Sequence, residues 1–220
     1  ARMSSARLPG KMLKMLGNMT LIDRVYSNLK KTEGVSKIIV ATSEDDTDLP
    51  LVNHCYKNKI NCYRGSLKDV ASRYLQISQA EHEAAFVRIS GDSPIIDSEL
   101  VGQLIREYKE GCFDLVTNVH ERTYPKGQSV EVFSTKIFTE SYPLFNTPDH
   151  FEHVSSYYYE NADAFNIKNI RSGGYYNDIN LSIDTPEDYK RLEILALEYG
   201  ESLSSWRDSA NKYSELFINV

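Results

Sequence analysis

The spacing of apolar residues predicts a regular alternation of strands and helices in the first half of the chain. Short apolar runs rich in β-branched residues, typical of buried strands, lie at 37–42, 60–64, 85–90 and 113–117. Segments with apolar residues at helical spacing lie before and between these runs, at 21–29, 51–56, 69–82 and 97–109. Strands that alternate with helices in this way indicate βαβ units. We therefore expect an α/β fold with a mostly parallel central sheet and helices on both faces.

The alternation ends after residue 118, and the rest of the chain predicts a smaller α+β insertion followed by helices. The expected strands lie at 129–133, 165–170 and 181–183. One helix is expected to begin near residue 134. Three more are expected at 149–160, at 186–199 and over the last 20 residues. We expect the last of these to pack on the body of the protein or on a partner.

Length, charge and cysteine content each narrow the class of protein. The 220 residues suit a single domain, and the net charge of −6 argues against nucleic acid as a partner, because a phosphate backbone needs a basic face. There is no apolar run long enough to span a bilayer and no signal-peptide pattern, so we expect no membrane partner and a cytoplasmic location. The three widely spaced cysteines fit neither a disulfide framework nor a zinc site and are expected to be free thiols.

The first eleven residues form a cationic loop in an otherwise acidic chain. Arg2, Arg7 and Lys11 are interleaved with Ser4, Ser5, Pro9 and Gly10. Arginine offers a planar fork to phosphate, lysine a mobile point charge, and serine further donors, so the loop is a candidate polyphosphate cradle. The alternative is a solvated loop with ordinary surface charges. It is not a Walker A loop, because Gly10-Lys11 lacks the upstream glycine and the following Ser or Thr.

Two aspartates follow predicted strands, where ligands gather in open α/β sheets. Asp92 lies in the turn Gly91-Asp92-Ser93-Pro94, although an aspartate there can simply hydrogen-bond its own turn. Asp184 precedes Thr185, an expected helix N-cap that Pro186 and Asp188 complete, so the carboxylate of Asp184 is not needed as a cap. One or two carboxylates together with substrate phosphates are the usual protein site for Mg²⁺.

These segments carry a resemblance to a known family. The blocks that carry it are Ala1–Lys11, Tyr63–Ser66, Asp69-Val70 with Arg73-Tyr74, Val87–Asp97, Arg122–Pro125, Gly127, Val130–Ser134, Glu152–Val154 and Ile183–Asp188. In this order they closely resemble the bacterial cytidylyltransferases that make CMP-activated acidic sugars, of the spore-coat polysaccharide biosynthesis type. More distant relatives are the CMP-KDO and CMP-acylneuraminate synthetases.

The resemblance implies a Rossmann-like nucleotidyltransferase fold of the glycosyltransferase-A type, with a first strand expected upstream of Arg2. It divides the single domain into a nucleotide-binding half (1–118), an insertion for acceptor binding and dimerisation (119–185) and C-terminal helices (186–220). It also implies that the chain uses Mg²⁺ and CTP, transfers CMP to a small acidic, sugar-like acceptor, and forms a homodimer.

Roles for individual residues follow from the same resemblance. The residues implied in catalysis are Arg7, Lys11, Asp92 and Asp184, with both aspartates on Mg²⁺. Those implied in nucleotide binding are Arg2, Ser4, Ser5, Arg7, Lys11, Arg64, Gly65, Ser66, Arg73 and Gly91. Those implied on the acceptor side are Arg88, Asn118, Tyr124, Glu131, Glu152 and His153. Lys126 and the Gln128-Ser129 pair depart from the family pattern, in which an acidic residue and Leu-Asp are common, so the identity of the acceptor is open.

Several residues keep two interpretations. Glu131 points into the pocket if its two valine neighbours face the core, or it is a solvent-facing strand residue. His153 acts as a base for an acceptor hydroxyl or orders the acceptor loop, and we favour the second. The run Tyr157-Tyr158-Tyr159 fits a core and dimer contact better than a platform for stacking a base.

Rival functions also stay open. The chain is alternatively a nucleotidyltransferase for another nucleotide or for a phosphorylated non-sugar acceptor, or an inactive scaffold member of the family. A glycosyltransferase of the same fold normally carries an Asp-x-Asp metal motif. The nearest candidate, Asp45-Asp46-Thr47-Asp48, lies in an early polar turn and is expected to be solvated acid.

Overall fold

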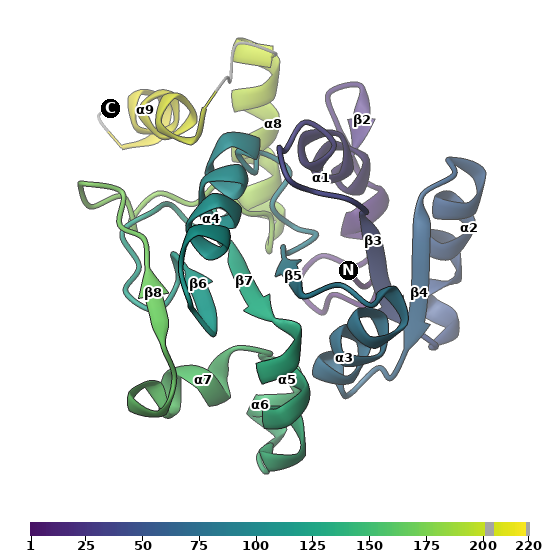
Figure 1. The fold of residues 1–220 in the computed structure, drawn as a ribbon. Coiled ribbons are helices and arrows are strands. Elements are labelled where there is room, and N and C mark those ends of the chain that lie inside the picture. The colour runs from purple at the N-terminus through teal and green to yellow at the C-terminus, as the bar shows by residue number, and fades with distance from the viewer. Residues whose placement is uncertain (201–204, 219–220) are drawn as a thin grey trace.

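A computed structural model describes residues 1–200 and 205–218 and places most strands in one layer (Figure 1). A parallel pair, β3-β4, lies beside a four-stranded sheet of order β5-β7-β6-β8, and β1-β2 form a small antiparallel hairpin. In the four-stranded sheet β7 is antiparallel to both neighbours while β8 is parallel to β6, so β5, β6 and β8 share one direction. The strands are β1 (Met15–Leu16), β2 (Met19–Thr20), β3 (Ile39–Ser43), β4 (Asn61–Gly65), β5 (Ala85–Arg88), β6 (Leu115–Thr117), β7 (Glu131–Ser134) and β8 (Ile167–Asn169).

Helices cover both faces of this layer, as the alternation of patterns predicts. Neighbouring residues of β7 enter different clusters: Val132 packs with α1 and α4, and Phe133 packs with α3, α5 and α7. Successive strand residues point to opposite faces, so both faces of the sheet are buried. The helices are α1 (Leu21–Leu29), α2 (Leu49–Lys57), α3 (Val70–Glu81), α4 (Ser98–Glu110), α5 (Thr135–Ser141), α6 (Pro148–Glu152), α7 (Ser156–Glu160), α8 (Pro186–Tyr199) and α9 (Trp206–Phe217). None of the described helices combines the length and apolar character that crossing a bilayer requires.

The elements of the first half, β3 to β6 with α2 to α4, lie where the sequence predicts them. The small hairpin β1-β2 was not predicted, because its strands are only two residues long. The C-terminal helix α9 is confirmed over Trp206–Phe217 and packs beside α8, whereas 201–204 and 219–220 lie outside the described residues.

Two predicted elements of the second half are wrong. The single helix expected over 149–160 is broken into α6 and α7 at His153-Val154-Ser155, residues with weak helix propensity. The strand expected at 181–183 is an extended segment whose backbone bonds to loops rather than to a strand. Leu181 N–H donates to the carbonyl of Lys126, and Ile183 N–H donates to the carbonyl of Asp92.

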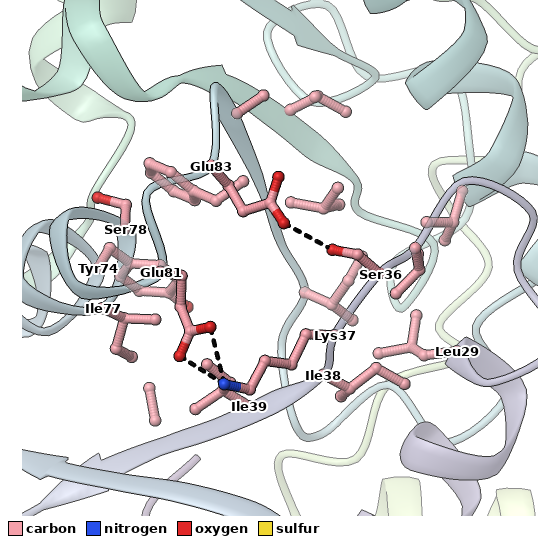
Figure 2. Close-up of a pocket in the computed structure, with 18 of the residues that line it drawn as sticks. Leu29, Ser36, Lys37, Ile38, Ile39, Tyr74, Ile77, Ser78, Glu81 and Glu83 are labelled. Carbon is pink, nitrogen blue, oxygen red and sulfur yellow. Dashed lines mark hydrogen bonds and ion pairs between the residues drawn. The ribbon is translucent and has the colours of Figure 1, made fainter.

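A cavity of about 520 Å³ separates β3 from β5 (Figure 2). It is lined by the two strands and by helices α1, α3 and α4, and its lining is mainly apolar. At one end the amine of Ala1 donates to the carbonyl of Ala41 at 2.9 Å. At another part of the rim Lys37 pairs with Glu81, and Ser36 donates to Glu83. The strand expected upstream of Arg2 stays a prediction.

Candidate active site

Three charged side chains from distant parts of the sequence meet at the ends of β5 and of the extended segment before α8. Lys11 Nζ donates to Asp92 Oδ2 and to Asp184 Oδ1, both at 2.9 Å, and to the carbonyl oxygen of Ile183 at 2.8 Å. Only 7% of the Lys11 side chain is exposed, against 26% for Asp92 and 39% for Asp184. The exposed Arg7 lies beside them, with Nη2 3.5 Å from Asp184 Oδ1. The structure thus brings together the four residues assigned to catalysis, called the carboxylate cluster below.

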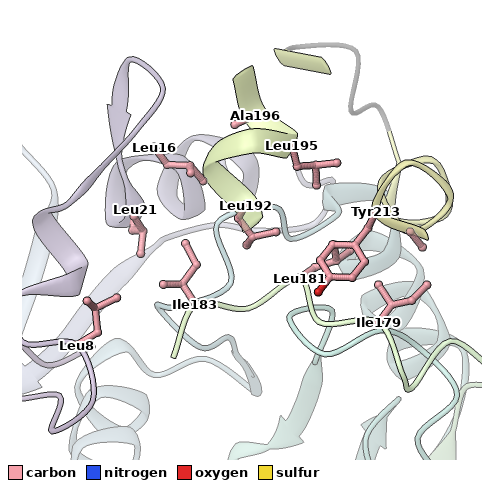
Figure 3. Packing of buried hydrophobic residues seen from close by; sticks show 11 residues of the cluster. Leu8, Leu16, Leu21, Ile179, Leu181, Ile183, Leu192, Leu195, Ala196 and Tyr213 are labelled. Carbon is pink, nitrogen blue, oxygen red and sulfur yellow. The ribbon is translucent and has the colours of Figure 1, made fainter. Parts of the chain in front are cut away.

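The backbone before α8 fixes the place of Asp184. The hydrogen bond from Ile183 N–H to the Asp92 carbonyl, 2.9 Å long, joins the two aspartate segments directly. Thr185 and Asp188 form the predicted capping box of α8, so the Asp184 carboxylate is not used as a cap. The side chain of Ile183 is buried in one hydrophobic cluster with Leu8 and Leu192 (Figure 3). This cluster therefore connects the cationic loop, the Asp184 segment and α8.

Gly127 allows the loop of residues 122–129, called the acceptor-side loop after its predicted role, to approach the Asp184 segment. Its φ is +88°, and a Cβ built there would lie 2.5 Å from the backbone of Leu181. Any other residue would be strained and would collide with backbone. The two segments are joined further by the hydrogen bonds of Lys126 with Ile179 and Leu181.

The cationic loop is a closed turn on which the side chains of Ser4 and Arg7 face outward. Gly10, with φ +73°, donates its N–H to the carbonyl of Met3 at 2.9 Å and closes the loop. Leu8 is buried beneath it, while Ser4 and Arg7 are exposed and Ser5 accepts a hydrogen bond from Leu8 N–H. Exposed donors around a buried anchor are the arrangement that a phosphate cradle requires.

Asp48 corrects the expectation that the early acidic turn is solvated. Its side chain is fully buried and accepts hydrogen bonds from Met3 N–H at 2.6 Å, Thr42 Oγ1 at 2.8 Å and Ser43 N–H at 3.0 Å. Burial alone would raise the pKa of Asp48, but the hydrogen bonds from Ser43, Met3 and Thr42 outweigh it and hold that pKa below its ordinary value. Asp48 therefore ties the cationic loop to β3.

Two arginines assigned to the nucleotide, Arg2 and Arg73, meet at the turn after β4. Arg2 pairs with Glu152 and lies 3.3 Å from the Leu67 carbonyl, and Arg73 donates to the carbonyls of Ser66 at 2.7 Å and Leu67 at 3.1 Å. Arg73 is almost fully buried, and this burial, followed by the nearby charge of Arg2, lowers its pKa.

Three other residues assigned to the nucleotide, Gly65, Arg64 and Gly91, have different surroundings. A Cβ at Gly65 would make tight contacts with the side chains of Tyr63 at 3.0 Å and Arg73 at 3.1 Å, which would have to shift slightly. Arg64 instead donates to the carbonyls of Ser43 and Glu44, so its guanidinium holds the loop after β3. Gly91 lies beside Ala1 and Met12, with a Cβ contact at 3.0 Å that favours glycine.

A second charged group lies inside the sheet and contains two residues, Arg88 and Glu131, that the resemblance assigns to the acceptor. Arg88 of β5 pairs with Glu131 of β7, its direct cross-strand neighbour, and Tyr159 Oη donates to Glu131 Oε1 at 2.6 Å. Thr117 Oγ1 lies 2.8 Å from the same tyrosine oxygen. Burial followed by the Glu131 charge raises the pKa of Tyr159, and that charge raises the pKa of Arg88 although burial opposes it. Glu131 is 1% exposed, so it is not the solvent-facing residue of the alternative interpretation.

Three other residues assigned to the acceptor side make no contact with the Arg88–Glu131 pair among the interactions described here: Asn118, Tyr124 and His153. Asn118 is buried and its amide bonds to the backbone of Gln128 and Val130. Tyr124 lies in the core against Trp206, with ring centroids 4.8 Å apart. The imidazole of His153 is 67% exposed and 3.6 Å from Asp149. Their contact with an acceptor stays a prediction.

No role was predicted for Gln128, although this residue departs from the family pattern. Gln128 is fully buried, donates to the carbonyl of Ile95 at 2.7 Å and accepts from Asp97 N–H at 3.0 Å. It therefore joins the acceptor-side loop to the turn after β5, which carries Asp92. A polar residue at a position that is commonly Leu was the signal that could have identified it.

The oxygen atoms around Lys11 fit a magnesium ion that is shared with a substrate. Two carboxylates and one carbonyl converge on a single cation, and all three supply the oxygen donors that Mg²⁺ prefers. Across residues 1–200 and 205–218 there is no group of three or more His, Cys, Asp or Glu side chains able to hold a metal. The site therefore fits a metal that takes its remaining ligands from water and phosphate, not a cage made of protein alone.

Comparison with known sequences agrees with the family that the sequence motifs suggest. A family model described as cytidylyltransferase matches residues 1–207 of the chain. An uncharacterized protein of Methanocaldococcus jannaschii is 32% identical over 192 residues, which are 86% of this chain and 78% of that protein. The spore coat polysaccharide biosynthesis protein SpsF of Bacillus subtilis is 28% identical over 91% of this chain and 85% of its own. A 3-deoxy-manno-octulosonate cytidylyltransferase of Fusobacterium nucleatum is 26% identical over 97% of this chain and 83% of its own.

Solved structures share the fold. A cytidylyltransferase from Leptospira borgpetersenii aligns with a TM-score of 0.90 and 28% identity, over 98% of this chain and 91% of that chain. A CMP:2-keto-3-deoxy-manno-octonic acid synthetase in complex with CTP aligns with a TM-score of 0.69 and 16% identity, over 90% and 96% of the two chains. At that identity the second likeness is one of fold alone, and it agrees with the predicted nucleotidyltransferase architecture.

Proposed function

This chain belongs to the cytidylyltransferase family, and we propose that it transfers CMP from CTP to a small acidic, sugar-like acceptor, with Mg²⁺, and releases pyrophosphate. The observation that carries the proposal is the carboxylate cluster, in which Lys11, Asp92 and Asp184 meet within hydrogen-bonding distance beside Arg7. Cations and metal-binding carboxylates at one point are what a triphosphate and its metal require.

In the proposed reaction an acceptor oxygen attacks the α-phosphorus of CTP. A bond forms between these two atoms while the bond to the bridging oxygen breaks, and pyrophosphate leaves with that electron pair. If the acceptor oxygen is a hydroxyl, its proton passes to solvent water. Such a reaction asks the protein mainly to position groups and to neutralise charge. Arg7 and Lys11 are the cations available for the departing pyrophosphate, and the loop donors hold the remaining phosphate oxygens. Bound Mg²⁺, on Asp92 and Asp184, would supply positive charge to the phosphate oxygens.

The acceptor is proposed to bind on the side of the sheet that carries β7 and α6. Arg88 and Glu131 lie there, next to strand ends that lead to Asp92, and Glu152 joins the same side to Arg2 of the cationic loop. An acidic acceptor is proposed because the curated relatives named above include enzymes for 3-deoxy-manno-octulosonate, an acidic sugar. The expected homodimer also stays a proposal.

The direct test measures pyrophosphate release with Mg²⁺ and CTP, UTP, ATP or GTP against a panel of acidic sugars and phosphorylated acceptors. We expect release with CTP and an acidic sugar, and its loss in Asp92→Asn and Asp184→Asn. Asp163→Asn, a change of the same kind at an exposed residue, is the matched control and should be fully active. Release with another nucleotide, or CTP turnover that survives both substitutions, would contradict the proposal.

A further inference from the structure

Lys11 occupies the position between the two carboxylates that a metal ion would need. An ammonium group has three N–H donors, and those of Lys11 point to Asp92, Asp184 and the Ile183 carbonyl at 2.8–2.9 Å. Its side chain is 7% exposed, so the ammonium is enclosed as well as fully bonded. In this arrangement Lys11 has no donor left for a phosphate oxygen.

The same arrangement opposes the entry of a metal ion. Asp92 Oδ2 and Asp184 Oδ1 are the oxygens that Lys11 holds, and a divalent cation on both would meet the ammonium at close range as a like charge. Charge balance leads to the same conclusion, because Lys11 and Arg7 together already neutralise the two carboxylates. Lys11 and a metal ion therefore compete for these oxygens.

A triphosphate removes the conflict because it offers Lys11 other partners. The cationic loop places Arg7, which is 66% exposed, next to Asp184, so phosphate oxygens bound by Arg7 would lie close to the Lys11 ammonium. Lysine is a point charge on a flexible four-carbon stem and can exchange a carboxylate for a phosphate without a change of backbone. Once the Lys11 ammonium has moved to the phosphate, the carboxylates of Asp92 and Asp184 would both be free to bind the metal.

We propose that Lys11 is a resident counter-cation that keeps the two-carboxylate site closed to metal until a nucleoside triphosphate draws its ammonium away. The proposal rests on the proposed function for the identity of the nucleotide. It makes the binding of metal and nucleotide mutually dependent, and by thermodynamic linkage each must strengthen the other by the same factor. In this proposal Lys11 binds the two aspartates in the absence of nucleotide and the phosphates in its presence.

The test measures Mn²⁺ binding to the 220-residue chain without nucleotide, by electron paramagnetic resonance of the free ion. We expect Lys11→Met, which keeps the length of the side chain and removes its charge, to bind Mn²⁺ at least tenfold more tightly than the unaltered chain. Lys14→Met is the matched control: it removes a nearby positive charge that lies over the Tyr189 ring, and its Mn²⁺ affinity should not change. Equal or weaker Mn²⁺ binding by Lys11→Met than by the unaltered chain would overturn the proposal.

A second measurement uses the unaltered chain and so does not depend on the folding of a variant. With ¹⁵N-labelled lysine, the Lys11 ammonium should give a protected NMR signal that persists with Mg²⁺ alone and shifts when Mg²⁺ and CTP are both present. A signal that is unchanged by Mg²⁺ and CTP together would overturn the proposal. The outcomes separate the two hypotheses. If the unaltered chain turns over CTP but Lys11→Met does not bind Mn²⁺ more tightly, only this inference is refuted. If Lys11→Met binds Mn²⁺ more tightly but the unaltered chain turns over no CTP, only the proposed function is refuted.

Discussion

The carboxylate cluster and the Arg88–Glu131 pair both hold charge on the same sheet, and they differ in what positions them. Lys11, Asp92 and Asp184 all lie outside the strands, and both aspartates are partly exposed. Arg88 and Glu131 are cross-strand neighbours of β5 and β7, and Glu131 is 1% exposed. The two aspartates are partly exposed and have room to exchange partners during a reaction, whereas Glu131 is buried between strands. We infer that the first cluster does the chemistry and the second positions the sheet around it.

The largest expected effect is on activity and falls on the carboxylate cluster. Asp184→Asn should lower kcat/KM about 1,000-fold, equivalent to about 4 kcal/mol, because the proposed Mg²⁺ would lose a charged ligand. Its free energy of unfolding should change by less than about 1 kcal/mol, since the side chain is 39% exposed. Steady-state kinetics and urea unfolding on the same preparation check both values. A large loss of stability would remove the distinction between the two clusters.

The opposite result is expected at the strand-borne pair. Glu131→Gln leaves Arg88 without its charged partner and should lower the free energy of unfolding by about 3 kcal/mol, as for other buried pairs that lose one member. The double variant Arg88→Met, Glu131→Leu removes both charges and should be more stable than Glu131→Gln alone. Urea unfolding of the three proteins is the measurement. If Glu131→Gln is as stable as the unaltered protein, the Arg88–Glu131 pair does not have the structural role proposed for it.

Asp48 gives an intermediate case, because it is buried and yet holds the loop that carries the cations. Asp48→Asn should cost about 2 kcal/mol of stability, since it weakens the hydrogen bonds to Met3, Thr42 and Ser43. Asp45→Asn, a change in the same turn at a partly buried side chain, is the control. Differential scanning calorimetry at neutral pH measures the difference, and equal values for the two variants would contradict a positioning role.

The same residue predicts a response to acid. The pKa of Asp48 in the folded chain lies below its ordinary value of 3.8, so its stabilising contribution is complete above about pH 4. That contribution is lost as the pH falls from there through the folded-state pKa. The unaltered chain should therefore lose more stability between about pH 4 and pH 2 than Asp48→Asn does. Parallel pH dependence in both proteins would show that Asp48 does not titrate with folding.

The elements and the site residues that follow local rules were predictable from sequence. The spacing of apolar residues located α1 to α4 and β3 to β6. The predicted N-cap of α8 at Thr185 left the Asp184 carboxylate free for another role. The burial of Asp48 was not predictable, because a polar turn is buried only once another segment, here the cationic loop, covers it. The same holds for Gln128, Asn118 and the pairing of Lys11 with both aspartates, which depend on contacts between segments far apart in the chain.

The smallest expected effect tests whether the strand-borne pair acts alone. Tyr159→Phe removes the hydrogen bond to Glu131 and should lower stability by about 1 kcal/mol, because Arg88 still neutralises the carboxylate. Tyr157→Phe is the matched control, since its ring packs against Phe145 at 5.0 Å and that contact is kept. Urea unfolding and kcat/KM are measured on both variants. If Tyr159→Phe loses activity while keeping its stability, the phenol contacts a substrate, and the acceptor side takes part in the reaction more directly than its buried geometry indicates.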